Sequence, residues 1–283
     1  MTVNGLGFKH YPGFVGYMQN FVFNGQQYFE KARDDQLSSG SFRMTAKFGK
    51  KDRILHNAVT FKSKYTFVGL PQLKAYSRLN LYFQFKTREP NGLLFFNGGG
   101  QKHDFIALEM INGQMHYIFD LGDGPRRIQS KIKNNLNDNR WHMVTLGRPS
   151  LNQHTMLIDD TLMRISGSAG SERNLHLDLN GLFYFGGVRD DMWQMLPKSI
   201  KSRNGYEGCI ASLDLNGETF NLVGNEVLIP STLVESGCSA PITRCSSTAC
   251  ANRGICVQLW NSYTCDCDLT TFSGPTCADG NGK

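Results

Sequence analysis

Cysteine is the residue type whose number and spacing in this chain most clearly permit chemistry, either metal binding or disulfide formation. All eight cysteines follow residue 208, and the last six lie between Cys245 and Cys277. Zinc binding by these six is disfavoured, because the segment has no histidine and too many sulfurs for one structural zinc site. Small domains with little core use such a density of cysteines for crosslinks. Residues 245–277 are therefore predicted to form a disulfide module, although spacing alone does not choose among the connectivities.

The two remaining cysteines, Cys209 and Cys238, lie 29 residues apart and outside that module. We expect them to pair with each other. In the loop-entropy account, a crosslink of this span stabilises the fold by about 3 to 4 kcal/mol when it forms without strain. The first 208 residues contain no cysteine. The chain therefore divides into a larger cysteine-free part and a small crosslinked part.

The residue types that carry catalysis are present, but not in catalytic patterns. No Gly-x-Ser-x-Gly elbow occurs, and the glutamates are scattered, without the paired carboxylates that a glycosidase needs. Gly98–Gly100 lacks the Lys-Ser or Lys-Thr that would follow in a phosphate-binding loop. Trp141 and His142 stand at the expected start of a strand, where we interpret the histidine as packing and not as a general base. The sequence therefore predicts a binding protein and not an enzyme.

Composition indicates a folded, soluble chain. The chain has 283 residues, of which 40% are hydrophobic and 19% are charged, and this suits one sizeable domain plus something smaller. No apolar run approaches the roughly 18 to 20 residues that span a bilayer, so we expect no direct membrane insertion by this chain. The net charge of +6 is spread over short basic groups and not over the dense runs of nucleic-acid-binding tails. No nucleic acid partner is expected.

The elements that must position any site are short segments rich in β-branched and aromatic residues, split by glycine or polar turns, between residues 58 and 220. Leu79–Lys86 alternates apolar and polar residues, and Asn112-Gly113 is a strong hairpin turn between two such segments. With no clear helical period in this region, we predict an antiparallel sandwich or barrel. The clearest predicted strands are 65–70, 79–86, 93–97, 105–111, 114–120, 141–147, 154–158 and 182–186.

The sequence repeats itself once at the spacing of a whole domain. Gly13–Gly25 matches Gly205–Gly217, because both begin with Gly-x-x-Gly, continue with an apolar segment and end with Asn-Gly, and the copies lie 192 residues apart. Self-similarity at this spacing predicts that the first residues are the closing strand of a preceding copy. Tyr17 stands where the later copy has Cys209, and no cysteine lies nearby to pair with it. We assign residues 1–46 to this remnant and a linker.

Several stretches together resemble a laminin-G (LNS) domain, over about residues 47–238. They are Asn91–Asn97 (NGLLFFN), Asp104–Glu109 (DFIALE), Leu136–His142 (LNDNRWH), Phe185–Gly187 (FGG) and Gly205–Cys209 (GYEGC). The resemblance implies an all-β fold, with a laminin-G-like (concanavalin-like) antiparallel β-sandwich that we place at residues 47–240.

Residues 241–279 resemble an EGF-like domain. The cysteines have the spacing Cys-x4-Cys-x5-Cys-x8-Cys-x-Cys-x9-Cys, with Gly254, Tyr263 and Gly274 at the positions expected in that family. The resemblance implies a small disulfide-rich domain with the pairs Cys245–Cys256, Cys250–Cys265 and Cys267–Cys277. The segment before the first cysteine lacks the acidic cluster of the calcium-binding subclass, and Gln258 departs from its hydroxylation pattern. We therefore expect no calcium in this module.

The order of modules, an LNS closing strand, a complete LNS domain and an EGF-like domain, resembles alpha-type neurexins. Trp260–Tyr263 and Phe272–Pro275 resemble the EGF module that follows the fifth LNS domain of that family. Contactin-associated proteins share the modules and are the near alternative. The resemblance implies an extracellular segment of a synaptic cell-adhesion receptor with a single-pass membrane parent. It also implies extracellular or synaptic adhesion proteins as partners.

The LNS resemblance further implies one calcium ion at the rim of the sandwich. Aligned on that pattern, Asp104 and Asp178 supply carboxylates, Leu121 and His176 supply backbone carbonyls, and water completes the shell. Calcium takes oxygen ligands in irregular geometry, so a site with few carboxylates is expected to be weak, in about the 10⁻⁴ to 10⁻³ M range of extracellular modules. The alternative is that both aspartates simply cap turns.

Two other functions stay open at the level of sequence. One is binding of glycosaminoglycans such as heparan sulfate, in which a cluster of basic side chains attracts sulfate groups by Coulomb attraction. The other is a structural spacer with no ligand of its own. The residues assigned to the glycan-binding alternative are Arg126, Arg127, Lys131 and Lys133.

Overall fold

The computed structural model of the chain describes residues 21–23, 26–28, 55–99, 104–166, 176–239 and 245–280. The chain divides into two compact units, Met1–Ile54 and Leu55–Lys283. Within the described residues the named elements are short β-strands and a 3-10 helix, and the second unit holds nearly all of them. The all-β prediction is confirmed.

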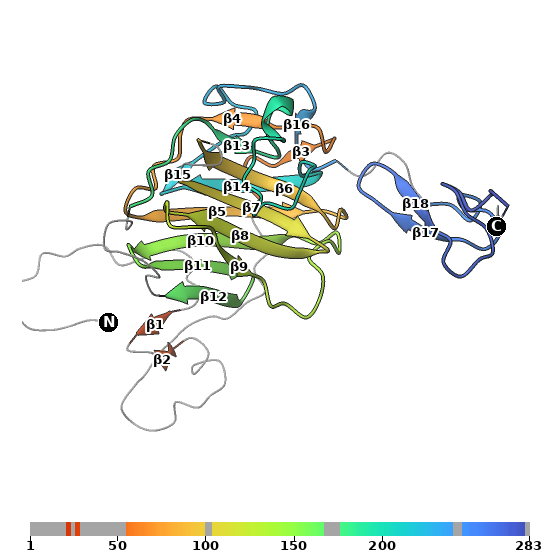
Figure 1. The fold of residues 1–283 in the computed structure, drawn as a ribbon, viewed down its shortest axis with the longest axis horizontal. Helices are drawn as coiled ribbons and strands as arrows, with labels where there is room; N and C mark the ends of the chain where they lie inside the picture. Colours follow the sequence, from red (N-terminus) through yellow and green to blue (C-terminus); the bar gives the residue numbers. More distant parts are fainter. Residues whose placement is uncertain are drawn as a thin grey trace, which may run out of the picture. The chain divides into compact units, whose positions relative to one another are not determined.

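The second unit contains two large antiparallel sheets, besides a two-stranded one near its C-terminal end (Figure 1). Among the described residues the first sheet has the order β12-β11-β10-β5-β14-β3-β16, with β15 paired to β14. Its strands are β3 (Val59–Phe61), β5 (Leu79–Lys86), β10 (His142–Ser150), β11 (Gln153–Ile158), β12 (Thr161–Ser166), β14 (Gly208–Leu215), β15 (Glu218–Thr219) and β16 (Val234–Ser236). The second sheet has the order β4-β13-β6-β7-β8-β9. Its strands are β4 (Val68–Leu70), β6 (Gly92–Gly98), β7 (Phe105–Ile111), β8 (Gln114–Asp120), β9 (Arg126–Gln129) and β13 (Phe183–Phe185).

The two sheets enclose one apolar core, to which both contribute buried side chains. Many of these side chains are aromatic and meet edge-on. Phe83 of β5 and Phe185 of β13 have ring centroids 5.5 Å apart, and Phe61 of β3 lies 6.1 Å from Tyr206. Such contacts stabilise the fold beyond the burial of apolar area alone. The sandwich prediction is therefore confirmed, and these two sheets are called the sandwich below.

The second sheet is covered on its outer face as well. A separate apolar cluster there includes Phe96 of β6 and Ala107 of β7, together with Val188, Leu196 and Ile200 of the segment that follows β13. This segment includes the 3-10 helix η1 (Asp190–Met192). Because both faces are covered, every residue of β6 is buried. Double burial explains why this strand lacks the alternation seen in β5.

Most predicted strands are present, with some differences at their ends. The predicted strands 79–86, 105–111 and 114–120 match β5, β7 and β8. Asn112 and Gly113 both have positive φ, 50° and 73°, as the predicted hairpin turn requires. The predicted strand 65–70 shortens to Val68–Leu70, because Thr66 closes a turn onto the Ser63 carbonyl at 3.0 Å.

The EGF-like segment, called the EGF module below, is built on a two-stranded hairpin. β17 (Ile255–Gln258) pairs with β18 (Tyr263–Asp266), and Cys256 lies opposite Cys265. The structure has the disulfides Cys245–Cys256, Cys250–Cys265 and Cys267–Cys277, which are the pairs that the EGF resemblance implied. A fourth disulfide, Cys209–Cys238, joins β14 to the segment after β16, as expected.

The first unit contains a hairpin whose register repeats one in the sandwich. β1 (Val22–Phe23) pairs with β2 (Gln26–Gln27) as β14 pairs with β15. The pair Val22–Gln27 corresponds to Asp214–Thr219, with each residue shifted by 192 positions. In the same way, the hydrogen bond from Tyr28 N to Phe21 O (3.0 Å) corresponds to the one from Phe220 N to Leu213 O (2.8 Å). The two copies of the internal repeat thus share a hairpin. The rest of the predicted 1–46 remnant, its boundary included, lies outside the described residues.

A close approach at Gly186 provides a test of the core packing. Gly186 has φ of +88°, and a Cβ there would lie 2.1 Å from the Phe61 ring, whereas Gly181 has φ of +78° and nothing within 4 Å. We expect Gly181→Ala to lower the unfolding free energy by about 1 to 2 kcal/mol through backbone strain alone. Gly186→Ala should cost about 1 to 3 kcal/mol more, because it adds overpacking. Urea unfolding measures both, and equal losses would contradict the proposed contact.

Candidate functional site

The candidate calcium residues lie at one end of the sandwich, where β7 begins and β8 ends. Phe105 pairs with Asp120 in antiparallel register, so Asp104 and Leu121 are the next residues beyond that pair at the same edge. Asp120 turns the chain there, because its carboxylate accepts two backbone N–H groups of the following turn, at 2.8 and 3.1 Å. The register of the hairpin thus brings two of the four predicted ligands to one edge.

Asp178 reaches the same place from 74 residues further along the chain. Its backbone N–H donates to Oδ2 of Asp104 at 2.8 Å. Just before it, the His176 ring stacks on Tyr76 with centroids 4.3 Å apart, and the Leu177 N–H donates to the Tyr76 carbonyl at 3.0 Å. The structure therefore joins the two predicted carboxylate residues directly and places His176 two residues away. We call Asp104, Leu121, His176 and Asp178 the rim.

Residues 176–182, called the strap below, are held by a buried asparagine that sequence reasoning missed. The Asn97 side chain of β6 is fully buried, and its Nδ2 donates to the carbonyls of Asn180, Gly181 and Leu182 at 3.2, 3.3 and 3.1 Å. Its Oδ1 accepts the N–H of Leu73 at 3.0 Å. A polar side chain within an apolar strand was the available signal, since a buried amide needs partners.

A fully buried arginine also supports the strap. Arg148 of β10 follows Val144 and Leu146 on the inward face of its strand. Its guanidinium donates to the carbonyls of Ala75 and Tyr76 at 3.2 and 2.7 Å. The Tyr76 carbonyl also accepts the N–H of Leu177 in the strap. Arg148 therefore fixes the backbone to which the strap is hydrogen-bonded. Sequence reasoning missed this residue too, although a charged side chain in the inward register was visible.

Burial raises the pKa of Asp104, and the charges of Asp120 and Asp178 raise it further, whereas the Asp178 N–H and the Arg148 charge lower it. A cation would relieve this crowding of carboxylates, and hard oxygen donors suit calcium. Among the residues that the structure describes, no group of three or more His, Cys, Asp or Glu side chains could hold a metal. Calcium at the rim would therefore depend on backbone carbonyls and water beside two carboxylates. This donor set fits weak calcium binding.

The four residues of the glycan-binding alternative do not form one exposed basic patch. Arg126 forms an ion pair with Asp123, and Arg127 lies 3.4 Å from the buried carboxylate of Glu109. Only Lys131 and Lys133 of this set are exposed. The charges of the two arginines are thus partly neutralised by their own neighbours.

The Glu109 carboxylate organises the segment that covers the second sheet. It accepts the backbone N–H groups of Lys201 and Ser202 at 2.9 and 2.7 Å. Beside it, Arg127 lies 2.7 Å from Nδ1 of His116, whose pKa falls to about 4 through burial and through the charges of Arg127 and Lys201. His116 is therefore neutral at pH 7 and can accept from the guanidinium. Arg127 has a structural role here.

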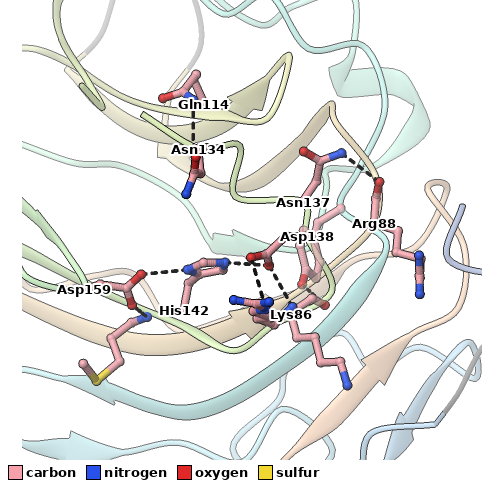
Figure 2. A network of polar contacts seen from close by, with 11 residues as sticks. Lys86, Arg88, Gln114, Asn134, Asn137, Asp138, His142 and Asp159 are labelled. Atoms are coloured by element: carbon pink, nitrogen blue, oxygen red, sulfur yellow. Dashed lines mark hydrogen bonds and ion pairs between the residues drawn. The ribbon is translucent and has the colours of Figure 1, made fainter. Parts of the chain in front are cut away.

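His142 lies between two carboxylates in the network that Figure 2 shows. Its Nδ1 is 2.7 Å from Oδ2 of Asp159, and its Nε2 is 2.9 Å from Oδ1 of Asp138. Burial lowers the pKa of His142, but the hydrogen bonds and charges of the two aspartates outweigh burial, so the net pKa is raised above 6.5. Both ring nitrogens have carboxylate partners, a polar network that the interpretation of this histidine as packing did not include.

Comparison with known sequences identifies relatives of this chain. A profile of the laminin G domain matches residues 85–218. Neurexin 1 of Drosophila melanogaster is 50% identical over 274 residues, which cover 95% of this chain and 15% of the relative. Neurexin-2 of Homo sapiens is 41% identical over 266 residues, which cover 94% and 15%. The chain thus spans about 15% of the length of these curated relatives.

Two solved structures share the fold. The LG1-3 region of the laminin alpha2 chain matches with a TM-score of 0.54 and 24% identity, covering 66% of this chain and 36% of that one. Domains LG4-5 of the mouse laminin alpha1 chain match with a TM-score of 0.50 and 20% identity, covering 70% and 51%. At such identities the likeness supports the fold alone.

Two further observations concern the cellular location of the chain. Its four disulfides suit an oxidising environment, as outside the cell. Among the described residues, none of the helices is long and apolar enough to cross a membrane.

The His142 network predicts a pH dependence of stability. Because the folded pKa is raised, this residue contributes stability that is fully present below pH 6.5 and is lost as pH rises through the folded pKa. Asp159→Asn should lower the pKa of His142, measured by NMR titration of the imidazole, and should flatten this part of the stability profile. Asp160→Asn, at the exposed neighbouring position, is the control and should leave both unchanged. An unchanged or higher His142 pKa in Asp159→Asn would contradict the role of the network.

Proposed function

Because the chain belongs to the neurexin family, we propose that it is an extracellular adhesion segment whose sandwich binds one calcium ion at the rim and presents that rim to protein partners. The observation that carries the proposal is the hydrogen bond from the Asp178 N–H to the Asp104 carboxylate at 2.8 Å. It brings the carboxylate residues together from two segments far apart in sequence. The Asp178 charge also raises the pKa of Asp104, which supports the nearness of the second carboxylate.

The proposed ligands divide between side chains and backbone. Asp104 and Asp178 would supply carboxylates, while Leu121 and His176 would supply carbonyls, and water would complete the shell. When bound, calcium would offset the mutual repulsion of the carboxylates and link β7, β8 and the strap. With so few carboxylates the affinity should lie in about the 10⁻⁴ to 10⁻³ M range, so the site would respond to extracellular calcium.

The construction of the rim supports the proposal that it binds proteins. The strap and the β8–β9 turn are loops held on a rigid scaffold, the arrangement that commonly carries recognition. We propose extracellular or synaptic adhesion proteins as partners and a membrane-anchored receptor as the parent protein. The chain spans about 15% of the length of its relatives. Partners that bind other parts of the parent protein are therefore not part of this proposal.

The glycan-binding alternative has weaker support. Arg126 and Arg127 each have an acidic neighbour, Asp123 and Glu109, which reduces the charge they offer to sulfate groups. Heparan sulfate binding at the four basic residues stays a prediction, and so does the role of a spacer without a ligand.

Isothermal titration of the full chain with calcium tests the rim. We expect a site of millimolar or tighter affinity in the unchanged protein, and roughly tenfold or weaker binding in Asp104→Ala/Asp178→Ala. Asp190→Ala/Asp191→Ala removes the same charge from two exposed positions and should bind calcium like the unchanged protein. The proposal fails if the unchanged protein gives no binding heat, or if both double variants bind equally.

A further inference from the structure

Two glutamates of the sandwich stand side by side where the EGF module meets it. Glu89 follows β5, and Glu207 precedes β14. The buried Thr87 hydroxyl connects their backbones, because it donates to the Glu207 carbonyl at 2.6 Å and accepts the Glu89 N–H at 2.9 Å. The separation of the two glutamates is therefore set by the fold of the sandwich itself.

The loop between β17 and β18 of the EGF module brings two consecutive N–H groups to these carboxylates. The Trp260 N–H donates to Oε1 of Glu89 at 2.9 Å, and the Asn261 N–H donates to the Glu207 carboxylate. The Asn261 side chain also donates to the Lys62 carbonyl. The Trp260 side chain is 1% exposed, whereas Ile255 of the same module is 52% exposed. Trp260 is thus the buried anchor of this contact, which we call the junction.

The junction gathers like charge in a place with limited access to water. Burial is the largest cause that raises the pKa of Glu207, and the charge of Glu89 adds to it. The Asn261 N–H and the charge and N–H of Lys64 act in the opposite direction, yet the pKa rises to about 7. Of the other charged groups nearby, Lys62 pairs with Glu235, and Arg88 directly precedes Glu89.

We propose that the Glu89–Glu207 pair makes the docking of the EGF module on the sandwich depend on protons, so that the junction is tightest when Glu207 is protonated. When both carboxylates are ionised, docking removes the water that hydrates them and screens their repulsion, and this loss opposes docking. When the EGF module moves away, Glu207 regains water and releases its proton more easily.

The sign of the dependence follows from linkage. On this proposal Glu207 has the higher pKa in the docked state, because burial outweighs the Asn261 N–H, so the docked state binds more protons than the undocked state. Docking is therefore favoured as pH falls and weakens as pH rises through about 7. Between pH 6 and pH 8 the docking equilibrium should change by up to about tenfold, and by less where solvent screens the pair. The orientation of the EGF module would then respond to pH within the physiological range.

Amide hydrogen exchange of the full chain tests the proposal. Protection of the Trp260 and Asn261 amides, corrected for intrinsic exchange, should be up to about tenfold greater at pH 6 than at pH 8. In Glu207→Gln the amides should stay protected and the dependence should vanish, because glutamine can accept the same N–H without titrating. Glu218→Gln, at an exposed position of β15, should retain the dependence of the unchanged protein.

Loss of protection at the amides of β7 and β8 would show that Glu207→Gln does not fold. In that case a second variant, Glu89→Gln, still tests the proposal. Glu89→Gln retains Glu207 but removes the neighbouring charge, so the midpoint of the pH dependence should move to lower pH. Protection independent of pH in the unchanged protein, or a dependence that survives in Glu207→Gln, would overturn the proposal. So would an unmoved midpoint in Glu89→Gln.

Discussion

Covering the second sheet on both faces is the constraint on which the rest of this structure depends. One face packs against the first sheet through an aromatic core, and the other is covered by the segment after β13. Because β6 and β7 are buried on both faces, their register cannot slip without exposing apolar side chains. That register places Asp104 at the edge of the sheet and Glu109 beneath the covering segment. The candidate site is thus a consequence of how the core is closed.

Carboxylates that accept backbone N–H groups recur at three places where a loop meets the sandwich. Asp104 receives the strap, Glu109 receives the covering segment, and Glu89 receives the EGF loop. An ionised acceptor makes a stronger hydrogen bond than a neutral one, so each contact orders its loop. The same charge has a cost where two carboxylates come close, as at the rim and at the junction. A cation would relieve this cost at the rim, and a proton would relieve it at Glu207.

Sequence patterns predicted the sheets better than they predicted the site. The alternation in Leu79–Lys86 and the Asn112-Gly113 turn follow local rules, so three strands matched to the residue. Asp104 and Asp178 were linked only by family resemblance, because their hydrogen bond spans 74 residues. Asn97 and Arg148 were missed, since their roles depend on which backbone carbonyls the fold brings to them. The contact of Glu89 with Trp260, 171 residues apart, had no local signal either.

An NMR titration of the full chain with calcium tests most directly the proposed calcium site where the strap meets β7 and β8. We predict saturable shifts centred on the amides of Leu121 and Asp178, with the EGF amides unaffected. Shifts centred on another part of the chain, or none at millimolar calcium, would contradict the proposal.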